Sequence, residues 1–81
     1  MVFVAVTPVG LAEALRLAAG DDAIWCGSDA ISDSEYKALE RPGLSRFNYS
    51  LADSKVADRA IATVEEHHPG QTIWVEAAPR A

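Results

Sequence analysis

The stretch VFVAV, residues 2–6, is the most informative segment of this chain for its fold. It is continuously apolar and rich in β-branched side chains, which is typical of a strand that is buried on both faces. TPVG follows directly, with Thr7 as the expected N-cap of a helix and Pro8 at its first position. A doubly buried strand that leads at once into a helix favours a parallel sheet with helices on both sides.

Outward from this segment, the apolar pattern alternates between strands and helices. The further expected elements are a strand at 23–26, a helix at 33–40, a strand at 44–50 that has one polar face or lies at an edge, a helix that begins at Asp53 or Ser54, and a strand at 72–77. We expect residues 1–77 to form a single α/β domain and residues 78–81 to form a loose C-terminal tail.

The order βαβαβαβ is compatible with two architectures. In the favoured one, the 17 residues from Gly27 to Gly43 cross over between neighbouring strands, and the chain forms a small four-stranded, mainly parallel sheet with three helices. In the alternative, the same segment is an elaborated turn, and the chain folds as a ferredoxin-like split βαβ sandwich of the α+β class. The doubly apolar first strand favours the parallel sheet, whereas the half-polar third strand favours the two-layer sandwich.

Composition limits the classes of partner. The 81 residues include 12 acidic and 7 basic side chains, for a formal net charge of −5. Such an acidic surface repels phosphate groups, so we expect neither nucleic acid nor a membrane as partner. The opening MVFVAV lacks the basic region of a targeting signal and is too short to span a bilayer. The lone Cys26 excludes an intrachain disulfide and is compatible with a reducing cytoplasm, where we expect the protein to reside.

A ligand site, if present, is expected at the carboxyl edge of the parallel sheet, where three strand-to-helix loops meet. The residues of these loops that could bind a ligand are Thr7, Gly10, Gly27, Ser28, Asp29, Asp53 and Ser54. Helix N-termini attract anions, but neither nucleotide-binding fingerprint is present and the loops hold no Lys or Arg. Asp29, Asp53 and Glu76 could instead hold a divalent cation through oxygen ligands. Caps and turns explain these Ser and Asp residues more simply, so we expect no cofactor and no metal.

Catalysis by Cys26 would require a base, and the only imidazoles in the chain are His67 and His68. The parallel sheet places the thiol and these imidazoles at opposite edges, whereas the split fold could bring them to one edge. Glu65 and His68 lie one helical turn apart, but no third zinc ligand is evident. We therefore predict no catalytic set and favour a protein that is not an enzyme.

Trp25 and Trp74 each follow an isoleucine in an expected strand, so Ile24 and Ile73 point to the opposite face from their neighbours. If one sheet face lacks a helix layer, an Ile or a Trp from each strand is exposed, and an exposed aromatic patch usually marks a protein interface. The favoured function is therefore a protein-interaction or self-associating module, whose partner is another protein or a second copy in a homodimer. The alternative is a small-ligand or divalent-metal binding domain, or a small enzyme, that uses the carboxyl edge.

Overall fold

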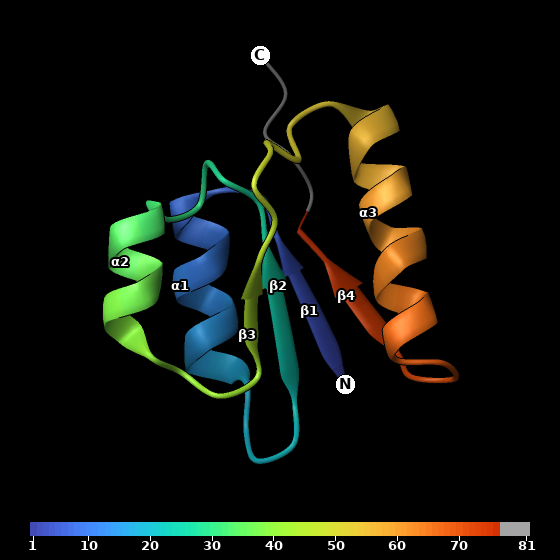
Figure 1. Cartoon of the computed structure of the whole chain (residues 1–81). Helices are drawn as coiled ribbons and strands as arrows, with labels where there is room; N and C mark the ends of the chain where they lie inside the picture. The colour runs from blue at the N-terminus through green and yellow to red at the C-terminus, as the bar shows by residue number, and fades with distance from the viewer. Residues whose placement is uncertain (77–81) are drawn as a thin grey trace.

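The computed structural model describes residues 1–76, which form one four-stranded parallel sheet in the order β3-β2-β1-β4 with three helices (Figure 1). The strands are β1 (Val2–Ala5), β2 (Ala23–Cys26), β3 (Leu44–Arg46) and β4 (Ile73–Val75), and the helices are α1 (Pro8–Leu17), α2 (Asp33–Leu39) and α3 (Ser54–His67). The predicted α/β fold is confirmed, and the ferredoxin-like alternative is not needed. The tail expected at 78–81 lies outside the described residues.

Strand β1 lies at the centre of the sheet and pairs in parallel with both β2 and β4. Val2, Val4 and Val6 pack on one face, and Phe3 and Ala5 pack on the other. All five side chains are at most 5% exposed. This double burial is the reason that the segment is apolar at every position.

Helices α1 and α2 cover one face of the sheet (Figure 1). The Thr7 side chain accepts a hydrogen bond from the Gly10 N–H and caps α1, and Ser32 caps α2 in the same way through the Glu35 N–H. The core on this side is formed by Phe3, Ala5, Leu11, Ala14, Ile24, Cys26, Ala30 and Leu44.

Helix α3 packs on the other face, and Figure 1 shows it beside β4, at the opposite end of the sheet from β3. The Asp53 carboxylate caps α3 by accepting hydrogen bonds from the N–H groups of Lys55 and Val56. Ala60 and Val64 are the buried side chains of α3, and they join a core that includes Leu51. Among the described residues α3 is the one helix on this face, and no second helix covers the part that β2 and β3 form.

The strand expected at 44–50 ends at Arg46, which is the main difference in boundaries from the prediction. β3 is an edge strand that pairs only with β2 among the described strands, and β2 itself ends at Cys26. The Phe47 N–H still donates to the Cys26 carbonyl, at 2.8 Å between N and O. Beyond Phe47 the regular ladder stops, and the next backbone hydrogen bond between the two segments runs from the Ser28 N–H to the Tyr49 carbonyl.

Candidate functional site

The carboxyl edge of the sheet has a switch point between β1 and β4, because the chain adds strands to one side of β1 first and to the other side last. Open α/β sheets place ligands at such a point. The structure brings Thr7 and Gly10, at the start of α1, together with Glu76, which directly follows β4. Of the residues singled out in the sequence, these form the closest cluster of polar groups at this edge.

The group that occupies this position is the Glu76 carboxylate of the chain itself. It accepts hydrogen bonds from the N–H groups of Val6 at 2.6 Å and Thr7 at 2.8 Å. It also accepts a hydrogen bond of 2.5 Å from the Thr7 hydroxyl. A Cβ atom at Gly10 would overlap the Glu76 carboxylate, so the missing side chain of Gly10 makes room for it. The N-terminus of α1 therefore holds an anion, as its dipole favours, but that anion comes from the protein.

The other loop residues serve local structure. A Cβ atom at the buried Gly27 would lie 2.8 Å from Leu51 Cγ, so this glycine permits close packing of two loops. The Ser28 N–H donates to the Tyr49 carbonyl, and the Asp29 carboxylate accepts from the Ser50 hydroxyl. These contacts join the loop after β2 to the segment after β3.

At the third loop, Asp53 is the N-cap of α3 and Ser54 is its first, exposed residue. Asp29 and Asp53 make separate hydrogen bonds, neither of them to Glu76. Among residues 1–76, no group of three or more His, Cys, Asp or Glu side chains is arranged to hold a metal ion.

Cys26 lies in the core under α1 and α2 and is 0% exposed. Its burial raises the pKa of the thiol to about 11, although the nearby Arg46 acts in the opposite direction. His67 and His68 contact Trp25, which belongs to the core on the other face. The thiol is therefore protonated at neutral pH and separated from both imidazoles by the sheet.

The four residues singled out as interface candidates are divided between the two faces by the strand registers. Val4 pairs with Trp25, which places the indole on the α3 face, and Ile73 belongs to the same side. Phe3 pairs with both Ile24 and Trp74, so these two lie on the α1 and α2 side.

Their burial also differs. Ile24 is 1% exposed and offers no surface to a partner, whereas the other three candidates are half-buried. The Trp74 ring lies 5.7 Å from the Phe3 ring, measured between centroids, and covers the edge of that core.

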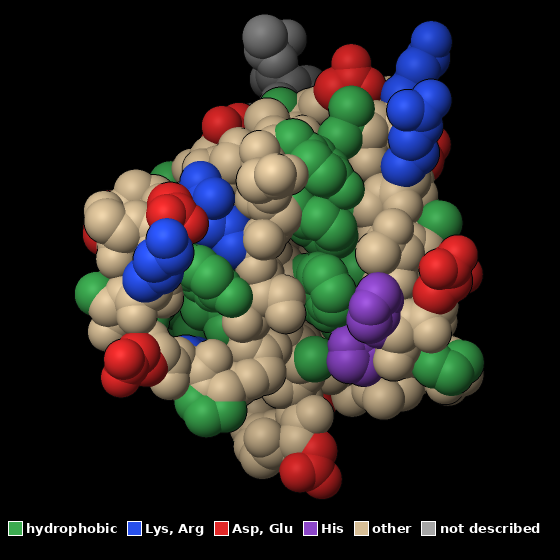
Figure 2. Space-filling model, viewed as in Figure 1, with side chains coloured by type: hydrophobic (Ala, Val, Ile, Leu, Met, Phe, Trp, Pro, Cys, Tyr) green, Lys and Arg blue, Asp and Glu red, His purple; other side chains and the backbone are tan. Residues whose placement is uncertain are grey.

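Three aromatic rings continue across the α3 face from β2 into the segment after β3. We call Trp25, Phe47 and Tyr49 the aromatic strip. Ring centroids are 5.2 Å apart for Trp25 and Phe47, and again 5.2 Å apart for Phe47 and Tyr49. Trp25 and Phe47 are half-buried and Tyr49 is 40% exposed. Figure 2 shows a hydrophobic stripe that runs between the β3 segment and α3.

The two histidines at the end of α3 border one end of the aromatic strip, as Figure 2 shows in purple. The His67 ring centroid lies 5.3 Å from that of Trp25. The Trp25 indole N–H donates to His68 Nε2 at 3.2 Å, which fixes the indole against the helix end. The polar edge of Trp25 is thus satisfied while part of its ring stays accessible, an arrangement that suits an aromatic residue at an interface.

At the Tyr49 end of the strip, a hollow of about 370 Å³ opens between the loop after β3 and α3. Tyr49, Ser50, Val56 and Arg59 line it. Arg59 brings a positive charge to the wall that α3 forms along the strip. Lys and Arg side chains gather at this end in Figure 2, whereas the histidines lie at the other.

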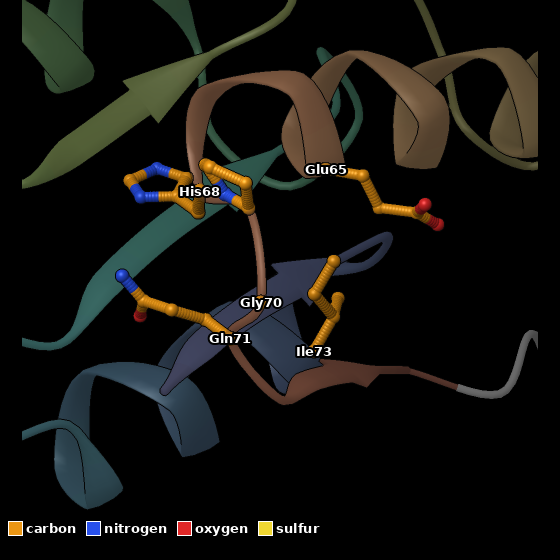
Figure 3. A pocket seen from close by; sticks show the side chains of 6 residues that line it. Glu65, His68, Gly70, Gln71 and Ile73 are labelled. Carbon is orange, nitrogen blue, oxygen red and sulfur yellow. The ribbon is translucent and has the colours of Figure 1, made fainter.

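A second hollow, of about 490 Å³, lies at the C-terminal end of α3 (Figure 3). Glu65 and His68 both line it, but Figure 3 shows their side chains pointing away from each other. Their spacing of one helical turn therefore does not bring the carboxylate and the imidazole onto a common ion. The Gln71 side chain extends to the same side as His68, and its amide oxygen accepts a hydrogen bond from the Met1 amino group.

Sequence reasoning did not single out Phe47, Tyr49, Arg59 or the contact between Trp25 and His68. The alternation of Phe47 and Tyr49 with polar residues was the available signal, because it places both rings on one side of the chain. Comparison with protein-family models, with curated proteins and with solved structures gave no significant match. Within residues 1–76, no helix has both the length and the apolar character needed to cross a bilayer.

Proposed function

We propose that this domain is a protein-interaction module and that the aromatic strip is its binding surface. The observation that carries the proposal is the row of Trp25, Phe47 and Tyr49, whose rings are in mutual contact and partly open to solvent. Aromatic side chains are enriched at the centres of protein interfaces, because a rigid ring contributes a large apolar area at a low cost in conformational entropy. A hollow at the Tyr49 end provides a cavity for a side chain of the partner.

The alternative function, ligand or metal binding at the carboxyl edge, has weaker support. The N–H groups that could bind an anion at the switch point already donate to Glu76. Asp29 and Asp53 make local hydrogen bonds instead of converging on a vacant position. Catalysis by Cys26 also lacks support, because burial raises the pKa of its thiol to about 11 and a protonated thiol is a poor nucleophile.

The proposal is tested by selecting peptides from a random phage-displayed library against the full chain, and measuring their affinity by fluorescence anisotropy. Tyr49→Glu places a charge on the strip and should weaken the selected peptides by about tenfold or more. Leu39→Glu is the matched control, because Leu39 is 47% exposed but lies on α2, against the other face. Peptides that bind wild type and Tyr49→Glu equally well would show that the strip is not the binding surface.

A further inference from the structure

The side of α3 that borders the aromatic strip has a charge pattern that runs along the helix. On this side lie Lys55, Arg59, Ala62, Thr63 and Glu66. Arg59 is four residues after Lys55 and three or four before the adjacent Ala62 and Thr63, and Glu66 is seven residues after Arg59, so these side chains form one ridge. Arg59 lines the hollow beside Tyr49, which places this ridge at the wall of the strip. The ridge is basic towards the N-terminus of α3 and acidic towards its C-terminus.

The other charged side chains in the middle of α3, Asp58 and Glu65, flank this ridge on the far side of Ala62 from Arg59. At about 100° of rotation per residue, Asp58 and Glu65 lie about 100° or more around the helix from Arg59. Glu66, seven residues after Arg59, returns to within about 20° of it. Arg59 and Glu66 thus point the same way, about 10 Å apart along the helix axis. Both side chains are exposed, and neither takes part in an ion pair within the described residues.

The midpoint between Arg59 and Glu66 falls between Ala62 and Thr63, which are small side chains. Two such helices can approach closely in antiparallel orientation about a twofold axis at this midpoint. Arg59 of each copy then lies opposite Glu66 of the other, and this ion pair forms twice. The ridge is therefore complementary in charge to itself, and only when the two helices are antiparallel.

We infer that the partner of the aromatic strip is a second copy of this chain, bound across a twofold axis with the α3 helices antiparallel. This inference rests on the proposed function and adds the identity and the orientation of the partner. The strip lies next to the ridge, so each copy covers part of the other's aromatic surface when the ridges meet. Each chain carries a net charge of −5, so the general repulsion opposes pairing and the local complementarity must overcome it.

Sedimentation equilibrium of the full chain, at concentrations up to about 500 µM, tests whether this dimer forms. Arg59→Glu and Glu66→Arg should each weaken the dimer by about tenfold or more, because each places like charges opposite one another twice. An equimolar mixture of the two variants should form a heterodimer, since opposite charges then meet at both positions. The double variant Arg59→Glu/Glu66→Arg should regain self-pairing for the same reason. Charge reversal of Glu13 and Arg16, an exposed ion pair on α1, is the matched control and should have no effect.

Each remaining outcome overturns the inference. A monomeric wild type would eliminate the second copy as the partner, and peptides that depend on Tyr49 would still support the strip as a surface for another protein, such as a basic one. A dimer that resists both reversals, or a mixture that pairs no better than the single variants, would exclude the antiparallel geometry. A dimer that is sensitive to both reversals but unaffected by Tyr49→Glu would show that the ridge pairs without the strip. Circular dichroism of each variant establishes that loss of pairing is not loss of fold.

Discussion

Both faces of the sheet carry an apolar core, but among the described residues two helices cover one face and one helix covers the other. Right-handed crossovers explain the difference. The connections from β1 to β2 and from β2 to β3 move in the same direction across the sheet, so α1 and α2 lie on the same side. The connection from β3 to β4 moves the opposite way and places α3 on the other side.

A single helix leaves part of its face open, and the aromatic strip occupies this part. The exposed rings therefore follow from the strand order, since a second helix on the α3 side would have covered them. Side chains under α1 and α2 should therefore matter for stability, whereas those on the strip should matter for binding.

Ile24 of β2 lies on the face that α1 and α2 cover, here called the closed face, and is 1% exposed. The face that α3 covers in part is the open face. Ile24→Ala should lower the free energy of unfolding by about 3 kcal/mol, because it removes buried methyl groups and leaves a cavity. Phe47→Ala on the open face removes a larger side chain but should cost only about 1 kcal/mol, because water already reaches part of the ring. Urea denaturation of both variants measures the difference. Equal losses would mean that the two faces are equally closed.

Gly10 represents the switch point at the carboxyl edge. Gly10→Ala should destabilise the protein by about 2 kcal/mol, because the new Cβ overlaps the Glu76 carboxylate and breaks its hydrogen bonds to Val6 and Thr7. In a Glu76→Ala background the same change should be neutral or stabilising, since alanine favours the helix more than glycine does. Urea denaturation of the single and double variants measures this change in the effect of Gly10→Ala on the free energy of unfolding. The effect would be the same in both backgrounds if the Glu76 carboxylate did not lie against Gly10.

Cys26 tests the closed face through its chemistry. Because burial raises the pKa of this thiol to about 11, the folded protein keeps it protonated while the unfolded chain ionises at lower pH. At neutral pH this thiol does not lower the free energy of unfolding, because it is protonated in both states. As the pH rises from about 8.5 towards 11, ionisation in the unfolded chain lowers the free energy of unfolding. Cys26→Ala should cost about 1 kcal/mol at pH 7 through lost packing, and it should remove this part of the alkaline loss. Fast alkylation of the native thiol by iodoacetamide at neutral pH would contradict the prediction.

The sequence favoured the parallel α/β fold over the ferredoxin-like alternative, but it did not indicate the strip. VFVAV predicted a strand that is buried on both faces, and Thr7, Pro8 and Asp53 predicted two helix starts. Both tryptophans follow an isoleucine, yet they lie on opposite faces, because Trp25 pairs with Val4 and Trp74 pairs with Phe3. Strand register is set by long-range pairing, and a shift of one residue exchanges the faces.

The same limit applies to the carboxyl edge. Thr7 and Glu76 are 69 positions apart in the chain. No local sequence pattern indicates that the Glu76 carboxylate accepts hydrogen bonds at the N-terminus of α1. The strand order, which decides how many helices cover each face, likewise depends on contacts that the sequence pattern does not contain.

Tyr49 should give the smallest effect on stability and the clearest contrast with Ile24. It is 40% exposed, and its ring touches Phe47 at the rim of the strip, so Tyr49→Glu should change the free energy of unfolding by only about 0.5 kcal/mol. The measurement is urea denaturation at a concentration where the protein is monomeric, so that dimer dissociation does not contribute. A loss of about 2 kcal/mol or more would mean that the ring is part of the core. A near-neutral result, together with the expected loss of binding, would mean that this ring is needed for contact with a partner and not for folding.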